Sequence, residues 1–349
     1  MGKRVTITDV AREAGVSIKT VSNVINETGS MRPDTRARVQ ETMKRLGYRL
    51  NVSARAMKAG RTKLIGLALA GFGQPFMPYL ADSVIVAARE RGYGVIADTY
   101  GDGNVEDILA ETYRMGADGW IFFPAHGYAS AGTLDQPYPV VTVGDFDPVA
   151  VGGDADWVTM PNTAAVTELT GRLLDAGNRV IATMGTCLNG VGEEERARLL
   201  ARRDGATAQR VRGVVQAHRQ RGMEPDWRYM TIPAGWNRVG GAQGVRALLA
   251  SELPLPDAII CLNDASALGV ISELQKHGIQ VPGDVRVTGF DNVPDAEFST
   301  PALTTIDPDV IGYAKSAVDM LVDRIEGYDG PARKAVTDYR VVVRGSAVL

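Results

Sequence analysis

Five residues near the start of the chain carry side chains that can read the edges of base pairs. Asn23 can pair with adenine through two hydrogen bonds, Lys19 can donate to guanine, and Ile18 can pack on the methyl group of thymine. Ser22 and Asn26 share this face if the segment is a helix, because residues three and four positions apart lie side by side. The spacing suits a helix that enters the major groove of DNA.

A helix that presents these residues needs a second element to hold it, and the sequence predicts a helical pair. Thr6 and Asp9 form a capping-box-like start for a first helix, which ends at Gly15, and Ser17 caps the second helix. The apolar positions follow helical spacing in both segments: Ile7, Val10, Ala11 and Ala14, then Val21, Val24 and Ile25. The pair is predicted to be a helix-turn-helix, although an ordinary helical hairpin would show the same pattern.

Charge is divided unevenly along the chain. Residues 1–63 hold 14 Lys and Arg against 5 Asp and Glu, a net charge of +9. The whole chain carries -3, so residues 64–349 carry -12 by subtraction. A basic head on an acidic protein is where a polyanion would bind. A solvated basic face is the alternative, but it does not explain why the basic excess coincides with the helical pair.

A third helix and a linker complete the head. The helix is predicted to begin at Pro33, which suits a first helical position, and to run to about Leu46, where Gly47 closes it. The segment 48–62 is short, rich in alanine and basic, and Gly60 lies near its end. Composition alone makes them a plain linker.

From Lys63 onward, short apolar runs alternate with amphipathic segments. The predicted strands are Leu64 to Ala70, Val95 to Ala97, Gly119 to Phe123, Val140 to Val143, Val180 to Met184, Ala258 to Leu262 and Val285 to Gly289. Helices are predicted at Tyr79 to Arg91, Ala164 to Ala176 and Ala265 to His277. This alternation favours an α/β core with parallel sheets covered on both faces, and its length favours two lobes.

Motifs of enzymes and metal sites are missing from the sequence. Gly71-Phe72-Gly73 and Gly101-Asp102-Gly103 do not continue as G-x-G-x-x-G, and neither a Walker A sequence nor a G-x-S-x-G elbow occurs. His126, His218 and His277 are scattered without the spacing of zinc ligands. We therefore expect a protein that is not an enzyme and that uses neither a cofactor nor a metal.

Compartment and cysteine usage give two further expectations. The chain has no apolar run of about 18 residues, and its first residues are basic and polar, so we expect no membrane association and a cytoplasmic, nucleoid-associated protein. Cys187 and Cys261 lie in or beside predicted buried strands. Small core residues are therefore expected there rather than a disulfide or a metal pair.

The residues of the head resemble the lactose-repressor (LacI/GalR) family, and the resemblance extends over essentially the whole chain. It rests on Val5-Thr6, the acidic helix start at Asp9, the run Ala14-Gly15-Val16-Ser17 and the run Thr20-Val21-Ser22. It implies a core of two Rossmann-like lobes, as in periplasmic sugar-binding proteins, with crossings near Pro161, Asp307 and Asp338. The implied domains are a head (1–49), a hinge helix and linker (50–62), an N-lobe (63–161 and 308–338) and a C-lobe (162–307 and 339–349).

The resemblance also implies which residues contact DNA. In this family, paired hinge helices lie in the minor groove and wedge an apolar side chain into the base stack, and Met57 stands at that position, where leucine is usual. The implied minor-groove and phosphate contacts of the hinge are Asn51, Ala54, Arg55 and Lys58. The predicted contacts of the head are Thr6, Ser17, Ile18, Lys19, Thr20, Ser22, Asn23 and Asn26.

Candidate effector residues follow the ends of predicted strands, where open α/β sheets bind their ligands. Phe72 and Phe76 lie in a segment that resembles the family's Asn-Pro-Phe-Phe sequence, and they fit either sugar stacking or core and dimer packing. Trp236, Arg210 and Asp264 match family residues that form the pocket wall and grip the effector, while Asp264 is also expected to cap the helix that begins at Ala265. A further match, Asp291, is assigned a supporting role near the hinge.

These observations predict a homodimeric transcriptional regulator, most readily a repressor of carbohydrate-utilisation genes. Two heads would read a pseudo-palindromic operator in double-stranded DNA, and a sugar or sugar derivative would control the affinity. Two alternatives stay open: a DNA-bound regulator or architectural protein without a small-molecule effector, and a regulator with a non-sugar, nucleoside-like corepressor.

Overall fold

The computed structural model describes residues 5–26, 28–48, 60–101, 114–124, 134–186, 188 and 192–349. The chain forms two compact units, Met1–Thr62 and Lys63–Leu349. The described residues of the first unit fold into α1 (Ile7–Ala14), α2 (Ile18–Ile25) and α3 (Pro33–Leu46), as the sequence predicted.

Local chemistry explains where these helices begin and end. The Thr6 hydroxyl accepts the Asp9 N–H while the Asp9 carboxylate accepts the Thr6 N–H, which completes the predicted capping box. Gly15 ends α1 at φ 61°, a left-handed conformation that favours glycine. The three helices enclose a small apolar core made of Val10, Ala11, Ala14, Val21, Val24 and Val39.

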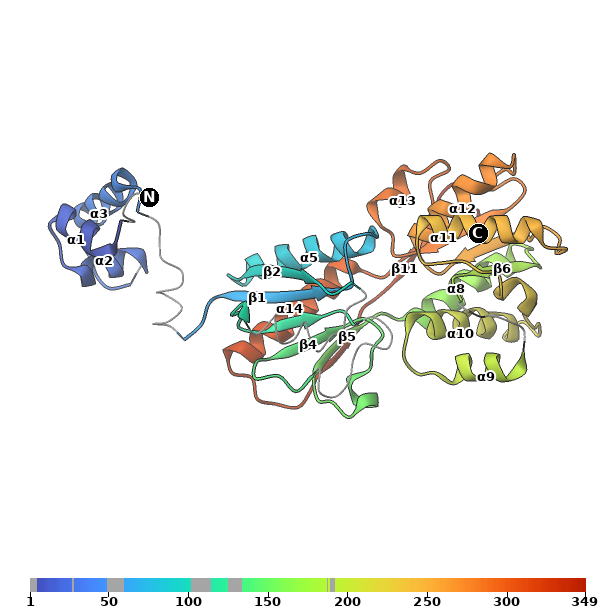
Figure 1. Ribbon diagram of the computed structural model, residues 1–349, viewed down its shortest axis with the longest axis horizontal. Coiled ribbons are helices and arrows are strands. Elements are labelled where there is room, and N and C mark those ends of the chain that lie inside the picture. Colours follow the sequence, from blue (N-terminus) through green and yellow to red (C-terminus); the bar gives the residue numbers. More distant parts are fainter. Residues whose placement is uncertain are drawn as a thin grey trace. The chain divides into compact units, whose positions relative to one another are not determined.

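The second unit contains two sheets, which define its two lobes (Figure 1). In the described part of the N-lobe, every strand pair is parallel, in the order β10-β5-β4-β3-β1-β2. The strands are β1 (Leu64–Leu69), β2 (Gly94–Thr99), β3 (Trp120–Phe122), β4 (Val140–Val143), β5 (Asp156–Thr159) and β10 (Lys334–Val336).

The sheet of the C-lobe has the order β11-β9-β8-β7-β6 over the described residues. Its pairs are parallel except for β11, which runs antiparallel to β9 at the edge. The strands are β6 (Ile181–Met184), β7 (Ala258–Cys261), β8 (Arg286–Phe290), β9 (Thr304–Asp307) and β11 (Arg340–Val342).

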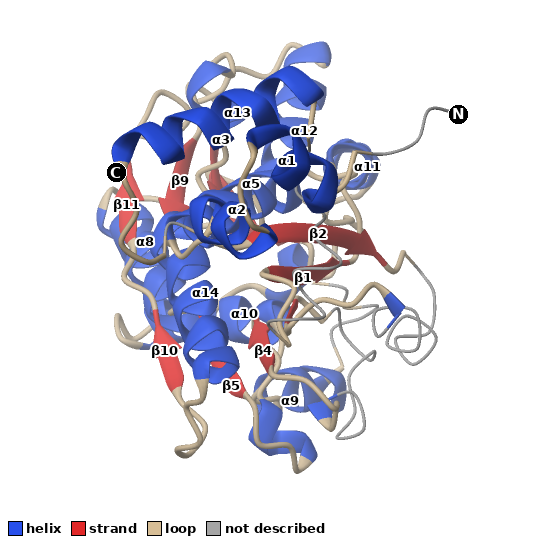
Figure 2. Cartoon of the chain, turned by 90° about the vertical axis from the view of Figure 1, so that its left-hand side faces the viewer, coloured by secondary structure: helices blue, strands red, loops and turns tan. Residues whose placement is uncertain are grey.

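Helices flank the strands of this unit (Figure 2). In the N-lobe, α5 (Phe76–Glu90) packs against α14 (Val310–Glu326) over one face of the sheet. In the C-lobe, α8 (Asn162–Asp175) and α10 (Ala206–Arg219) cover one face, while α11 (Arg238–Ala250) and α12 (Asp264–Lys276) cover the other. The shorter elements are η1 (Pro148–Val151), α9 (Glu193–Ala201), η2 (Trp227–Met230) and α13 (Pro294–Phe298).

Within the described residues, the chain passes between the two lobes three times. It leaves β5 for α8 at residues 160–161, leaves β9 for α14 at 308–309, and leaves β10 for β11 at 337–339. The third passage lies beside the other two, since the Thr337 N–H donates to the Thr159 carbonyl at 3.1 Å and Arg340 contacts Asp307 at 2.8 Å. Any change in the angle between the lobes must be absorbed in these passages.

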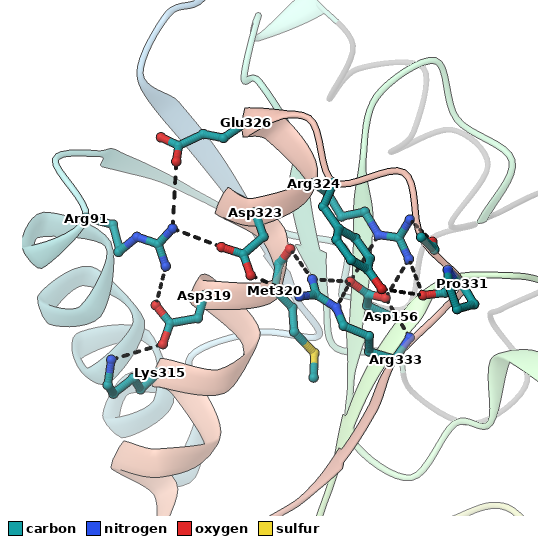
Figure 3. A network of polar contacts seen from close by, with 12 residues as sticks. Arg91, Asp156, Lys315, Asp319, Met320, Asp323, Arg324, Glu326, Pro331 and Arg333 are labelled. Atoms are coloured by element: carbon teal, nitrogen blue, oxygen red, sulfur yellow. Dashed lines mark hydrogen bonds and ion pairs between the residues drawn. The ribbon is translucent and has the colours of Figure 1, made fainter.

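A network of ion pairs joins several elements of the N-lobe (Figure 3). The Asp156 carboxylate at the start of β5 is fully buried and receives Arg324 of α14 at 2.9 Å and Arg333 at 2.7 Å. Arg333 also contacts Asp323 at 2.9 Å, and Asp323 in turn contacts Arg91. The network therefore ties β5, α14, the end of α5 and the approach to β10 into one body.

None of the helices in the described part of the chain is long and apolar enough to cross a membrane. Cys261 is a buried free thiol on β7, which agrees with a core role, while Cys187 lies outside the described residues.

Candidate functional sites

The first candidate site is the face of α2 in the head. Ile18 is 48% exposed, and Lys19 and Asn26 are exposed as well. Ser22 and Asn23 are half-buried on the same helix. The structure thus leaves the five predicted base-reading side chains on the surface that the head core does not use.

The predicted contacts at the helix starts also carry local structure. The Ser17 hydroxyl accepts the Thr20 N–H at 3.0 Å and lies 2.9 Å from the Thr20 hydroxyl, so both residues fix the first turn of α2. Thr6 does the same for α1. These hydroxyls lie where helix N–H groups can meet a phosphate, and their contact with DNA stays a prediction.

The predicted hinge contacts, Asn51, Ala54, Arg55, Met57 and Lys58, lie outside the described residues. Their roles remain those implied by the family resemblance.

The second candidate site is a cavity of about 670 Å³ that is lined from both lobes. We call it the interlobe cavity. The N-lobe contributes the segments that follow β1, β3 and β4, and the C-lobe contributes the loop before α10 and the segments that follow β7 and β8. The cavity therefore lies at the carboxyl ends of parallel strands, where this class of sheet binds ligands.

Arg210 occupies the C-lobe wall of this cavity and is 4% exposed. Its Nε donates to Asn162 Oδ1 at 2.7 Å, and one Nη donates to the backbone carbonyl of Leu262. Its guanidinium stacks 3.5 Å from the centroid of the Phe290 ring and lies 3.9 Å from an Asp291 carboxylate oxygen. These contacts fix the guanidinium plane before any ligand enters.

Aromatic side chains supply the apolar walls. Trp236 is held by a 2.8 Å hydrogen bond from its Nε1 to the carbonyl of Gly185, and Arg210 lies 5.3 Å from the centroid of its ring. From the N-lobe, Phe76 packs on Phe123 with centroids 5.9 Å apart. Flat faces of this kind can stack on the apolar side of a ring-shaped ligand.

Burial shifts the proton affinity of the carboxylates in the cavity. Burial raises the pKa of Asp291 to about 7, although Arg210 acts in the opposite direction. Burial likewise raises the pKa of Asp145, again against Arg210 and two hydrogen bonds. Each carboxyl group can accept hydrogen bonds when ionised and donate one when protonated. The cavity can therefore match a ligand rich in hydroxyl groups.

Several cavity residues also connect the lobes. Asn263 of the C-lobe donates to the Gln74 side chain of the N-lobe at 3.2 Å. Asn162 donates to the Asp145 carboxylate, and the Gly205 N–H donates to the Asp145 carbonyl at 2.9 Å. A ligand in the cavity would contact the groups that hold the lobes in this arrangement.

The structure brings together three of the five predicted effector residues, because Phe76, Arg210 and Trp236 line the interlobe cavity. Phe72 is 47% exposed and lies outside the cavity wall. Asp264 is fully buried and does not line the cavity either. The expectation that Asp264 caps α12 was wrong: Asn263 is the cap, because its side chain accepts the Ser266 N–H at 2.9 Å.

Four cavity residues were missed or given a lesser role in the sequence analysis. Asp145 and Asn263 directly follow the strand segments around β4 and β7, so the rule about strand ends could have found them. Asp291 was expected only to support the site, yet it lines the cavity wall. Tyr313 lies on α14, far along the chain, and no sequence signal indicated it.

Comparison with known proteins identifies the two units separately. Residues 6–51 match the family model described as bacterial regulatory proteins, lacI family, and residues 170–347 match the periplasmic binding protein-like domain.

Three relatives cover most of the chain. The ribose operon repressor of Escherichia coli K12 is 32% identical over 323 residues, which is 92% of this chain and 93% of that protein. A LacI-type transcription regulator from Bifidobacterium animalis subsp. lactis is 42% identical with a TM-score of 0.76, over 82% of this chain and all of that one. The transcriptional regulator CelR, solved in complex with cellobiose, is 27% identical with a TM-score of 0.70, over 99% of this chain and all of that one.

The exposed α2 face of the head, the two-lobed core and the similarity to these relatives all indicate the same family. The chain belongs to the lacI family of bacterial regulatory proteins and is a DNA-binding transcriptional regulator.

Proposed function

We propose that this regulator represses carbohydrate-utilisation genes and that a sugar bound in the interlobe cavity controls its affinity for the operator. The observation that carries the proposal is the cavity itself, which combines flat aromatic walls with a prearranged arginine and carboxyl groups. A sugar ring offers apolar C–H faces to Trp236 or Phe76 and hydroxyl groups to Asp145 and Asp291. The relatives named for ribose and cellobiose support this class of ligand.

The head supplies the DNA contacts of the proposal. Lys19 and Asn23 would read base edges in the major groove, while the Ser17 end of α2 would contact a phosphate. Two chains related by a two-fold axis would read a pseudo-palindrome, and paired Met57 side chains would kink its centre. We place this action in the cytoplasm, at the nucleoid, where the operator is found.

Control follows from the contacts between the lobes. The pairs Asn263–Gln74 and Asn162–Asp145 join the lobes, and Asn263, Gln74 and Asp145 line the cavity. A ligand that competes with or reinforces these pairs favours one lobe arrangement over another. If operator DNA also prefers one lobe arrangement, the effector changes the affinity for DNA, and DNA changes the affinity for the effector by the same factor.

The proposal is tested in two stages with the full chain. First, genomic fragments that bind the purified protein at near-physiological salt are sequenced, and an enriched pseudo-palindrome is expected. Second, operator binding is titrated with ribose, cellobiose, other common sugars and nucleosides. Loss or gain of operator affinity with one sugar supports the proposal, and Asp291→Asn should reduce that response while leaving operator binding intact.

Other outcomes contradict parts of it. A response to nucleosides alone would favour the nucleoside-like corepressor. A specific operator with no response to any compound would favour a regulator without an effector. Diffuse binding that disappears with added salt would argue against sequence-specific recognition altogether.

A further inference from the structure

A turn of two consecutive residues after β8 has a backbone conformation that side chains disfavour. Asp291 has φ 120° and Asn292 has φ 49°, and neither is a glycine. Such residues cost free energy and persist only where the surroundings hold them, frequently at functional sites. Here the turn carries Asp291 into the wall of the interlobe cavity.

Asp264 supports this turn through hydrogen bonds. Its Oδ2 accepts the Val293 N–H at 2.9 Å, directly after the turn, and its Oδ1 accepts the Thr305 hydroxyl at 2.5 Å. The Asp264 backbone also hydrogen-bonds the Asp291 carboxyl group. Gly289 leaves room for this contact, because a Cβ there would lie 2.1 Å from Asp264 Oδ1.

The other side of the turn is attached to the strands that lead out of the C-lobe. The Asn292 amide donates to Asp307 at 3.1 Å, and its oxygen accepts Arg344 at 2.8 Å. Asp307 is the last residue of β9, immediately before the passage at 308–309. It also receives Arg340, the first residue of β11, at 2.8 Å. The turn therefore lies between the cavity and two of the three passages.

We propose that Asp264 is a positioning residue that does not contact the effector: it holds the Asp291–Asn292 turn so that Asp291 faces the ligand and Asn292 faces the crossing strands. The proposal rests on the proposed function for the nature of the ligand. It differs from a binding role for Asp264, because both carboxylate oxygens are already used and the side chain is fully buried.

The two roles predict different behaviour for a conservative variant. In Asp264→Asn, the amide oxygen can still accept the Val293 N–H and the amide nitrogen can donate to Thr305. Burial and the neighbouring Asp291 raise the pKa of Asp264 well above its ordinary value, so loss of its charge is tolerated there. Asp264→Ala removes both hydrogen bonds, and Thr305→Val removes one with little change in shape.

The first measurement is amide hydrogen exchange of the segment 289–294 in the full chain without ligand. We expect exchange of the Val293 N–H to be about tenfold faster or more in Asp264→Ala, nearly unchanged in Asp264→Asn, and intermediate in Thr305→Val. Glu273→Gln is the matched control, since Glu273 is another buried carboxylate on α12 and pairs with Arg246, Lys276 and His277, away from the turn. Unchanged exchange in Asp264→Ala would overturn the proposal.

The second measurement is the binding of ribose and cellobiose to the same variants by calorimetry. Asp264→Asn should bind within about threefold of the parent, while Asp291→Asn should bind about tenfold more weakly or worse. If Asp264→Asn is as weak as Asp291→Asn, Asp264 contacts the ligand and the proposal is wrong. If the parent binds neither sugar, the sugar part of the proposed function fails, and the exchange experiment still decides the role of Asp264.

Discussion

Replacing Asp156 by alanine should destabilise the core strongly, because the carboxylate is fully buried and anchors two arginines (Figure 3). Removing one partner of a buried ion pair costs about 3–5 kcal/mol. The lower end, about 3 kcal/mol, applies here because Arg324 and Arg333 keep side-chain exposures of 20% and 27%, and Arg333 retains Asp323. For a core of this size, that corresponds to a fall in thermal midpoint of about 5 °C.

Asp175→Ala is the matched control for that measurement. Asp175 also receives a two-bond arginine contact, from Arg221 at 2.8 and 2.6 Å, but its side chain is 66% exposed. Exposed pairs contribute little to stability, so its midpoint should fall by much less than that of Asp156→Ala. Thermal unfolding followed by circular dichroism compares the two variants. Equal midpoints would refute the reasoning that burial, rather than contact geometry, sets the contribution of these pairs.

The contribution of the Asp156 carboxylate to stability should depend on pH. Burial alone would raise the pKa of Asp156, but hydrogen bonds from Arg324 and Arg333 outweigh it and hold the pKa below its ordinary value. A carboxyl group whose pKa is lower in the folded than in the unfolded state stabilises the fold at pH values above its unfolded-state pKa, near 4. This stabilisation is lost as the pH falls through the folded-state pKa. The midpoint difference between the parent and Asp156→Ala should therefore shrink below about pH 4.

Three further predictions concern the two sites. Lys19→Ala should change base preference at one operator position at a cost of about 1–3 kcal/mol, whereas Arg55→Ala in the hinge should weaken all sequences alike, as measured by binding to operator libraries. Because burial raises the pKa of Asp291 to about 7, sugar affinity that depends on its carboxylate should fall as pH drops below that value, and calorimetry on Asp291→Asn should show no such dependence. Within the described residues, the buried Tyr313 hydroxyl has no hydrogen-bond partner, so Tyr313→Phe should keep or raise the thermal midpoint of the free protein while weakening sugar binding up to about tenfold; a lower midpoint would contradict this account.

The head and most core strands could be predicted because their signals are local. Capping at Thr6 and Ser17 and the closing glycines determine the helix ends, and continuous apolar runs mark strands that are buried on both faces. By contrast, β5 was missed because it begins with Asp156, a residue that strands normally exclude. Its charge is tolerated only because Arg324 and Arg333 reach it from about 170 residues away, which no local pattern reveals.

The candidate site shows the same division between local and distant signals. The rule that ligands bind at the carboxyl ends of strands leads to the segments after β7 and β8, which line the cavity, but Asp264 and Asp291 both satisfy it. Which carboxylate reaches the cavity depends on the backbone: the positive φ of Asp291 turns it toward the cavity, while Asp264, in the first turn of α12, is directed down toward Thr305. That choice depends on Gly289, which leaves the space that Asp264 fills. A sequence pattern can identify the carboxylates, but only the packing of three chain segments decides which one lines the cavity and which one is buried behind it.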